Sequence, residues 1–166
     1  MRANAVLALV CAFGACQSPK SPNLPKLYSV ALTFVSDCPL SVRSSGAWLN
    51  LTQNLPSDSF DTWLFIGESD RPLSTSMKTS AQHLVRNIDS ARILGFTHYP
   101  MVQIWKGSPM NGQLLYRGPI DNSATATGVA RVKPDSLFVQ NFLTRLRKGE
   151  KPTFEEHTVY GCYIEP

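Results

Sequence analysis

One short stretch constrains this 166-residue chain most: a β-type run, residues 28–35, leads through a turn into a helix-forming segment. Pro39 suits the first position of that helix, because a proline lacks the backbone N–H that would have no partner there. Cys38 therefore falls at the helix N-terminus, where free N–H groups and the helix dipole favour an anion. Such a position lowers the pKa of a thiol, and the thiolate is the nucleophilic form. The sequence predicts a reactive thiol at Cys38; the alternative is a cysteine that packs as a small buried hydrophobe.

The composition is that of a globular domain. Hydrophobic residues make up 43% and charged residues 17% of the sequence, and the length allows one domain with a substantial core. The formal net charge of +4 is scattered along the chain. Its most basic run, residues 145–151, is typical of a solvated helix end, where cations complement the helix dipole. We therefore expect no nucleic-acid partner.

The first sixteen residues have the pattern of an export signal. Arg2 precedes an apolar run, residues 5–15, that is too short to span a bilayer and suits a signal-peptide core. The run ends at Cys16 in a sequence that resembles a bacterial lipoprotein cleavage box, although Phe13 stands where that pattern usually has leucine. We expect residues 1–15 to be removed and Cys16 to be lipidated, which would anchor the protein to a membrane outside the cytoplasm. An ordinary secretory signal is the alternative.

Of the four cysteines, only two are expected in the folded part of the mature chain. Cys11 leaves with the signal, and Cys16 is acylated at the start of a proline-rich tether, residues 16–26. Cys38 and Cys162 remain in the folded part. Outside the cytoplasm thiols are oxidised unless something keeps them reduced, and the sequence leaves open whether these two meet.

Hydrophobic periodicity predicts one α/β domain over residues 27–166, including a C-terminal tail. Apolar residues recur with helical spacing over residues 39–55, 77–90 and 135–149. Short apolar runs bounded by turn residues predict strands at residues 28–35, 61–67, 101–105 and 113–117. Asp135 is the expected N-cap of the last helix, and Gly149 is its expected C-terminal stop. The order predicts a βαβ unit with parallel strands, followed by a ββα unit.

Three separated motifs, in this order, resemble one family. They are Cys38-Pro39 within residues 34–41, residues 115–122, and Gly161-Cys162 within residues 158–164. Together with a Tyr-Pro pair directly before a strand, they resemble the thioredoxin-like fold. More narrowly, they resemble extracytoplasmic members of the redoxin branch, the alkyl hydroperoxide reductase/thiol-specific antioxidant superfamily. The resemblance implies a central mixed β-sheet flanked by helices.

The resemblance also implies a site and a reaction. Cys38 would attack a protein disulfide or a peroxide, and a separate thiol reductant would recycle the protein without a cofactor. Pro39, Tyr99 and Pro100 would shape the groove in which a substrate chain docks, and the Tyr99–Pro100 bond would be cis. Without the resemblance, a trans proline at a strand start is the ordinary interpretation.

The chain departs from two patterns of its relatives. Thioredoxins carry Cys-x-x-Cys, whereas the fourth position here is Ser41, so the usual disulfide within the motif cannot form. Peroxiredoxins carry a threonine three residues before the reactive cysteine, whereas this chain has Val35, and Thr33 lies further back on the same strand face. Cys162 is then the candidate that resolves a mixed disulfide. The alternative is a permanent structural disulfide between Cys38 and Cys162.

Other polar residues give weaker signals. Of the three histidines, His98 is next to Tyr99 and is the one expected near Cys38, but no paired-ligand motif exists and no metal is expected. Arg117 and Asp121 flank the start of a long polar loop, where they either hold an anion or form a salt bridge with each other.

These observations predict a membrane-tethered, thioredoxin-like redoxin that acts on disulfides or peroxides through Cys38, with Cys162 as the resolving cysteine. An enzyme of the thiol-disulfide oxidoreductase or antioxidant type is expected. The alternative is a non-catalytic binding module that uses the same groove to hold a partner protein or a copper ion; the missing second motif cysteine and the missing threonine favour it.

Overall fold

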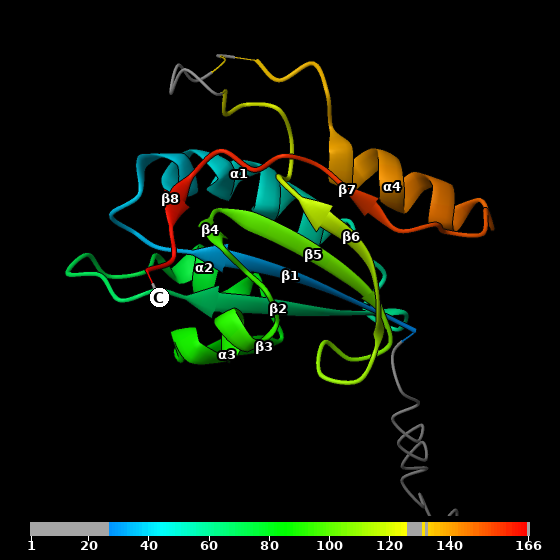
Figure 1. Ribbon diagram of the computed structural model, residues 1–166, viewed down its shortest axis with the longest axis horizontal. Coiled ribbons are helices and arrows are strands. Elements are labelled where there is room, and N and C mark those ends of the chain that lie inside the picture. Colours follow the sequence, from blue (N-terminus) through cyan, green and yellow to red (C-terminus); the bar gives the residue numbers. More distant parts are fainter. Residues whose placement is uncertain (1–26, 126–130, 132, 166) are drawn as a thin grey trace, which may run out of the picture.

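The computed structural model describes residues 27–125, 131 and 133–165 (Figure 1). The predicted signal peptide, the lipidation site at Cys16 and the tether up to residue 26 lie outside the described residues. The elements in chain order are β1 (Tyr28–Phe34), α1 (Pro39–Gln53), β2 (Phe60–Ile66), α2 (Thr75–Thr79), β3 (His83–Val85), α3 (Ile88–Ile93), β4 (His98–Tyr99), β5 (Met101–Lys106), β6 (Gln113–Gly118), α4 (Phe138–Arg147), β7 (Glu155–Glu156) and β8 (Cys162–Tyr163).

Within the described residues, six strands form a central mixed sheet in the order β3-β2-β1-β5-β6-β7. β1 pairs in parallel with β2 and antiparallel with β5, and β5 pairs antiparallel with β6. The predicted βαβ and ββα units are therefore confirmed, and they share β1 and β5 as neighbours at the centre. This arrangement is the thioredoxin-like fold that the sequence motifs implied.

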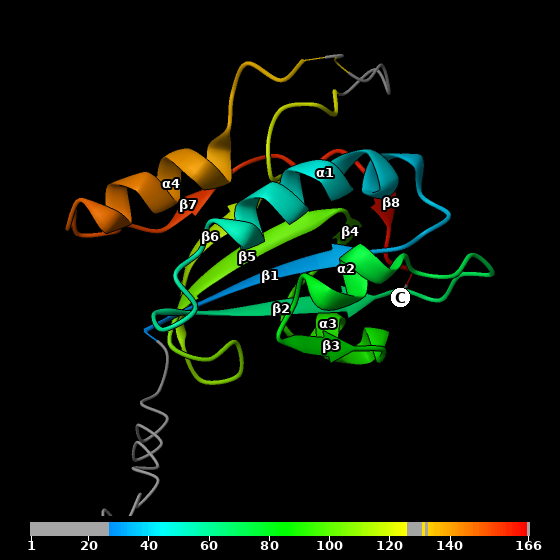
Figure 2. The same cartoon turned by 180° about the vertical axis from the view of Figure 1, so that it is seen from behind.

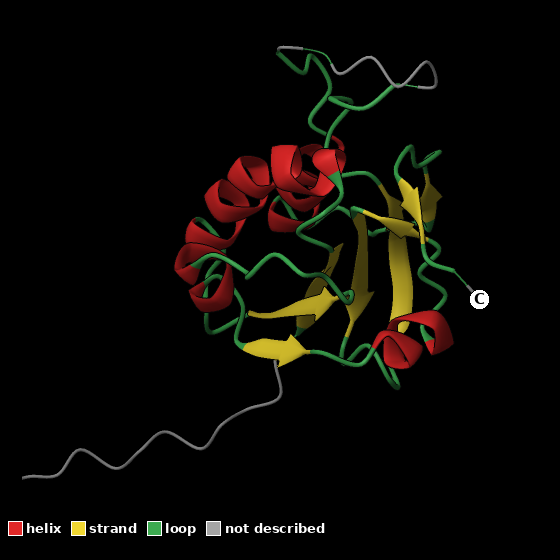
Figure 3. Ribbon diagram, turned by 90° about the vertical axis from the view of Figure 1, so that its left-hand side faces the viewer, coloured by secondary structure: helices red, strands yellow, loops and turns green. Residues whose placement is uncertain are grey.

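Helices cover both faces of the sheet (Figure 2, Figure 3). α1, α2 and α4 contribute to the larger core, in which Trp48 is the largest fully buried side chain. α3 contributes Ala91 to a smaller core on the other face, with Phe96 and Trp105. β1 supplies both cores, because successive side chains of a strand point to opposite faces: Val30 and Leu32 pack in the first core and Ala31 in the second.

The single helix predicted over residues 77–90 is wrong. The chain forms the short helix α2, then the strand β3, then the short helix α3. β3 adds in parallel to β2, where His83 lies opposite Trp63, and the backbone N–H of Gln82 donates to both oxygens of Thr62. Helical spacing of the apolar residues is thus overridden by ladder hydrogen bonds that a neighbouring strand supplies.

The predicted C-terminal end of the last helix is confirmed, whereas its predicted N-cap is wrong. Gly149 follows the helix with φ +78°, a conformation that suits glycine, and its N–H donates to Leu146. Asp135, however, is not the N-cap, because α4 begins three residues later at Phe138. The Asp135 carboxylate instead accepts hydrogen bonds from Asn122 and Arg131 and closes the preceding loop.

The residues after α4 form an extended segment, here called the C-terminal strap (residues 150–165). It runs from the end of α4 along β6, where β7 adds in parallel, and then to β4, where β8 pairs antiparallel (Figure 1). The sequence predicts only a C-terminal tail here, with no strand assigned to it. Across the described part of the chain, no helix is long and apolar enough to cross a membrane.

Candidate functional site

Cys38 lies at the end of the turn that connects β1 to α1. It is the N-cap residue of α1, with extended backbone, and its carbonyl accepts the helical hydrogen bond from Val42. Pro39 takes the first helical position, as the sequence predicted. No side chain caps the first turn and no acidic residue lies in it, so the partial positive charge of this helix end faces the cysteine uncompensated. The Cys38 side chain is 2% exposed.

Cys38 forms a disulfide with Cys162 of the C-terminal strap. Their Cα atoms are 6.2 Å apart, although 124 residues separate them in sequence. Cys162 is less buried than Cys38. The structure thus answers the question that the sequence left open: the two cysteines meet, and they meet at the helix N-terminus.

The loop that carries Pro100 lies against this disulfide. Cys38 Sγ is 3.4 Å from the carbonyl oxygen of Tyr99, and the Tyr99–Pro100 bond is cis, as the resemblance implied. The buried Tyr99 hydroxyl lies over Gly67, where an added Cβ would be 2.5 Å from it. Burial raises the pKa of Tyr99, and Glu68 raises it further against the opposing charge of Arg92, so the phenol stays neutral at ordinary pH.

Thr33 holds this loop in place. Its side chain is fully buried, and its hydroxyl donates to the carbonyl of His98 at 2.6 Å and accepts from the N–H of Met101 at 3.0 Å. These two partners flank the Tyr99–Pro100 pair, so one hydroxyl of β1 fixes both sides of the loop. Sequence analysis noticed Thr33 only as a threonine too far back to act as a peroxidase residue. A threonine in an otherwise apolar, buried strand was the available signal for this structural role.

Ser41 fills the position of the second thioredoxin cysteine. It is fully buried, and its Oγ accepts a hydrogen bond of 3.4 Å from the N–H of Val35. This contact joins the first turn of α1 to the end of β1. Ser41 therefore serves the turn that places Cys38, and the cysteine bonded to Cys38 comes from the strap instead.

The strap approaches the loop closely at Gly161. A Cβ on Gly161 would overlap the carbonyl oxygen of Tyr99 and lie 2.9 Å from its carbonyl carbon. Cys162 then pairs with Tyr99, Tyr163 pairs with His98, and the N–H of Ile164 donates to the carbonyl of Thr97 at 3.0 Å. Glycine is required before the cysteine, a constraint that the sequence motif contained without its reason.

A hollow of about 400 Å³ opens beside the disulfide. Of the residues predicted to shape a groove, Tyr99 lines it, whereas Pro39, the first residue of α1, and Pro100 are not among its lining residues. Arg92 donates to the carbonyl of Glu165 at its rim and pairs with Asp89. The lining comes from the start of α1, the end of β2, α3, β4 and the strap: Val35, Asp37, Cys38, Glu68, Ile88, Arg92, Tyr99, Cys162, Tyr163, Ile164 and Glu165.

Two further expectations concern polar side chains. His98 lies near the disulfide, because its ring packs on Tyr163, the residue after Cys162, but its side chain lines a neighbouring hollow with Arg117 and His157. Arg117 pairs with Glu156 of the strap at 3.5 Å, whereas Asp121 accepts from the N–H of Ser123, so the expected salt bridge between them is absent from the described contacts. Among the residues that the structure describes, no cluster of three His, Cys, Asp or Glu side chains is suited to a metal ion.

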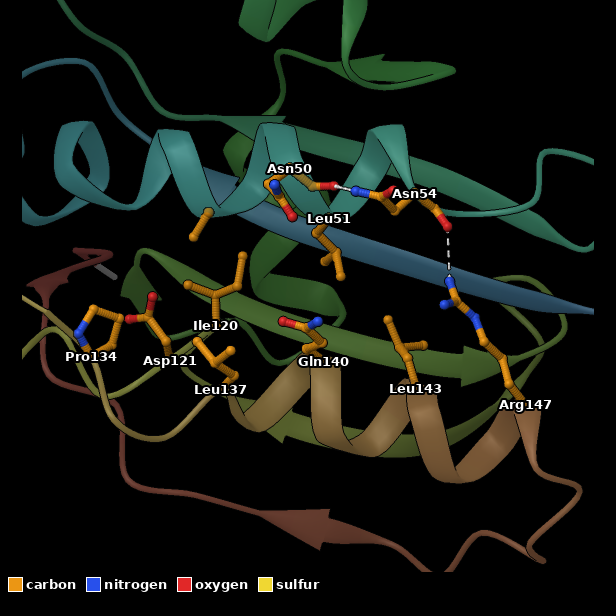
Figure 4. A pocket seen from close by; sticks show the side chains of 11 residues that line it. Asn50, Leu51, Asn54, Ile120, Asp121, Pro134, Leu137, Gln140, Leu143 and Arg147 are labelled. Carbon is orange, nitrogen blue, oxygen red and sulfur yellow. Dashed lines mark hydrogen bonds between the residues drawn. The ribbon is translucent and has the colours of Figure 1, made fainter.

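A second groove lies between α1 and α4, with a volume of about 280 Å³ (Figure 4). Leu51, Ile120 and Leu143 give it an apolar floor, and Arg147 spans one end by donating to the carbonyl of Asn54 at 2.9 Å. It contains neither cysteine and no histidine. Of these two openings, only the hollow beside the disulfide is lined by the cysteines.

Comparison with known proteins gives the fold and nothing finer. No family model matches the sequence, and no curated protein matches it. The structure is similar to that of the hypothetical protein SMc02350 from Sinorhizobium meliloti 1021, with a TM-score of 0.61 and 12% identity over 84% of this chain and 80% of that one. It is also similar to an uncharacterized conserved protein from Geobacillus kaustophilus, with a TM-score of 0.62 and 14% identity over 85% and 78% of the two chains.

The N-terminal domain of PilB from Neisseria gonorrhoeae aligns more distantly, with a TM-score of 0.44 and 12% identity over 61% of this chain and 74% of that domain. Fold and site together define the class: a thioredoxin-like α/β protein whose helix-start cysteine is joined to a cysteine of its own C-terminal strap. Such an arrangement is compatible with a redox role and with a binding role.

Proposed function

We propose that this chain is a thiol-disulfide redoxin in which Cys38 exchanges disulfides with a protein substrate and Cys162 resolves the intermediate. The observation that carries the proposal is the Cys38–Cys162 disulfide, which lies at the N-terminus of α1, against the carbonyl of Tyr99, and borders an open hollow. A disulfide that borders a solvent-filled hollow is accessible to an exchanging thiol, whereas one enclosed in a core is not.

The reaction begins with the reduced pair. The Cys38 thiolate attacks one sulfur of a substrate disulfide, so that a Cys38–substrate bond forms, the substrate S–S bond breaks and one substrate thiolate leaves. The Cys162 thiolate then attacks Cys38 Sγ, which forms the internal disulfide and releases the second substrate thiolate. The substrate gains two electrons and the cysteine pair loses them, and a separate thiol reductant returns the pair to the dithiol.

Recycling starts at the more accessible sulfur. Cys38 is 2% exposed, whereas Cys162 is partly exposed, so an incoming thiolate reaches Cys162 Sγ first. That attack expels Cys38 as a thiolate. The N-terminus of α1 stabilises this leaving group, and better-stabilised thiolates leave faster.

Two features act on the reduced Cys38 in opposite directions. The uncapped first turn of α1 favours the thiolate. Burial and the carbonyl oxygen of Tyr99, which is placed to accept an S–H, favour the thiol. Alkylation of the reduced protein by iodoacetamide across pH measures which of these dominates.

A disulfide substrate is favoured over a peroxide. The residue three positions before Cys38 is Val35, which offers no hydroxyl, and the hydroxyl of Thr33 is already engaged by His98 and Met101. Neither of these two positions therefore offers a free hydroxyl to position a peroxide. Consumption of hydrogen peroxide should accordingly be slow when compared with reduction of a protein disulfide.

The test uses the wild type, Cys38→Ser and Cys162→Ser in an insulin-reduction assay and in a peroxide-consumption assay. Cys38→Ser should abolish turnover. Cys162→Ser should keep the first attack but accumulate a Cys38–substrate mixed disulfide, visible on a non-reducing gel. Equal turnover by the wild type and Cys38→Ser would contradict the redox proposal.

The burial of Cys38 and its closure by the strap favour one alternative: a binding module in which the disulfide is permanent and the hollow holds a partner protein. Copper would need the reduced pair, because disulfide sulfurs are not thiolate ligands. Two results together would identify this alternative. The Cys38–Cys162 bond would stay intact in a glutathione buffer set to the redox potential of an oxidising compartment, and no turnover would be seen.

We further propose that the mature chain is an exported lipoprotein held at a bacterial membrane. The apolar residues 5–15 and Cys16 support this, and the Cys38–Cys162 disulfide fits an oxidising compartment. Mass spectrometry of the purified mature protein tests it: a diacylglycerol mass on Cys16 supports anchoring, and an unmodified N-terminus near residue 16 contradicts it.

A further inference from the structure

We infer that the strap occupies the edge of β4 as an internal stand-in for the substrate when the cysteines are oxidised, and that this edge selects a substrate segment of the form glycine-cysteine-aromatic. The inference rests on the proposed function and names its substrate class and its regulation. It follows from how residues 161–164 are seated.

The edge is a short strand whose pairing partner is the strap. β4 belongs to the two-stranded sheet β4-β8 and not to the central sheet. β8 pairs with it antiparallel, with Tyr99 opposite Cys162 and His98 opposite Tyr163, and Ile164 continues the pairing through its N–H to Thr97. Removing the strap would leave these backbone groups unpaired at a strand edge, which is a template for another extended chain.

Apart from the disulfide, a short pairing and the hydrogen bonds of Ile164 with Thr97 and of Glu165 with Arg92 hold the strap on this edge. Tyr163 is 76% exposed and Tyr160 37% exposed, and the pairing covers two residues of each strand. Val159 and Ile164 are partly buried against the smaller core. Segments with few buried apolar contacts open at low free-energy cost, so breaking the disulfide should free the β8 end of the strap without unfolding the sheet.

The part of the β4 edge that residues 161–164 occupy, here called the seat, selects residues on both sides of the cysteine. At the position before it, any Cβ would overlap the carbonyl oxygen of Tyr99, so glycine is required. At the position after it, an aromatic ring packs on His98, as Tyr163 does with ring centroids 4.4 Å apart. The next residue must offer an N–H to Thr97, which excludes proline.

A substrate strand and the strap cannot share this seat. The cysteine opposite Tyr99 has its Cα 6.2 Å from that of Cys38, and a substrate cysteine bonded to Cys38 would need the same place. When Cys162 attacks the mixed disulfide, β8 therefore takes back the edge and displaces the substrate chain. Resolution of the intermediate and release of the product become one event.

The first test measures substrate selection with full-length Cys162→Ser, in which Cys38 is free. The probe is a synthetic peptide of residues 159–165, its cysteine activated as a mixed disulfide with thionitrobenzoate, and the matched probe carries Gly161→Ala. The glycine peptide should react with Cys38 about tenfold faster, because the alanine peptide cannot take the seat. In urea-unfolded protein the two rates should be equal.

Equal rates on the folded protein would overturn the docking inference. A separate arm keeps this failure distinct from failure of the proposed function: reaction of the same variant with a small aromatic disulfide, which needs no strand seat. If Cys38 does not react even with the small disulfide, the redox function fails; if it reacts while the peptides are not distinguished, the docking inference alone fails.

The second test places Gly161→Ala in the intact wild-type chain. The added Cβ should unseat the strap, so that the Cys38–Cys162 bond is reduced at about a tenfold lower ratio of reduced to oxidised dithiothreitol. Gly46→Ala is the matched control, because nothing lies within 4 Å of its Cβ. An unchanged reduction midpoint in Gly161→Ala, determined by thiol labelling, would count against a seat that requires glycine.

Discussion

The central sheet with its larger core and the C-terminal strap are held by different forces. The sheet is held by apolar burial: β1, α1 and α4 all contribute to the larger core, and side chains such as Trp48, Leu32 and Phe142 are inaccessible or nearly so. The β8 end of the strap is held by a two-residue pairing, one covalent bond and the hydrogen bonds of Ile164 and Glu165 with Thr97 and Arg92, and it carries an exposed Tyr163. The contrast indicates a well-packed domain to which this segment is tied mainly by the Cys38–Cys162 disulfide.

The largest expected effect tests the core side of this contrast. Trp48→Ala removes a fully buried indole that packs in the larger core and donates to Ser80 at 2.8 Å. The free energy of unfolding should fall by about 3–5 kcal/mol. Urea denaturation followed by far-UV circular dichroism measures this loss. Val42→Ala on the same helix, where the side chain is half exposed, should change the stability by less than about 0.5 kcal/mol.

The next effect tests the disulfide. Cys162→Ser should lower the free energy of unfolding by about 2–4 kcal/mol relative to the oxidised wild type, because the bond closes a long loop in the unfolded chain. Hydrogen exchange sharpens the comparison. The amide of Ile164, which donates to Thr97, should lose its protection, while the amide of His157, which donates to Arg117 beside β7, should keep it. Simultaneous loss at both amides would show that the strap is one unit with the sheet.

A smaller effect concerns the hydroxyl that fixes the loop beside the disulfide. Thr33→Val keeps the side-chain shape but leaves the His98 carbonyl and the Met101 N–H without this partner, at a cost of about 1–3 kcal/mol. Cys38 should then be reduced more readily, because its neighbour Tyr99 is less firmly placed. Urea denaturation and thiol labelling measure both effects. Thr79→Val, on the exposed side of α2, is the matched control and should be nearly neutral.

The smallest effect is a pH dependence of the seat. Burial lowers the pKa of His98, so the unfolded chain takes up a proton there more readily than the folded protein does. This contribution to stability is therefore present above the ordinary pKa of 6.5 and is lost as the pH falls toward the lower folded-state value. Urea midpoints of the oxidised protein should fall slightly between pH values near 7.5 and 5.5, and His98→Gln should flatten this slope. His83→Gln is the matched control and should keep the pH dependence of the urea midpoint. If His98→Gln keeps it equally well, His98 is not its source.

Local rules predicted the parts of the fold that local interactions decide. The strand over β1, the proline at the first turn of α1, the β5–β6 hairpin and the glycine after α4 all followed from residue type and spacing. The rules failed between residues 77 and 90, where β3 forms because β2 offers it a ladder. They also failed at Asp135, whose carboxylate accepts a hydrogen bond from the Asn122 side chain instead of capping the helix. In each failure a partner distant in sequence changed the outcome.

The candidate site divides in the same way. The sequence by itself determined that a cysteine caps a helix, that Ser41 cannot form the usual disulfide with it and that Cys162 is preceded by glycine, because these depend on neighbours along the chain. The tertiary structure alone decided that Cys38 and Cys162 are bonded, that the carbonyl of Tyr99 lies against Cys38, and that Thr33 braces the loop that carries Tyr99. These contacts join residues from 61 to 124 positions apart, and no local preference specifies which distant strand edge a segment will take.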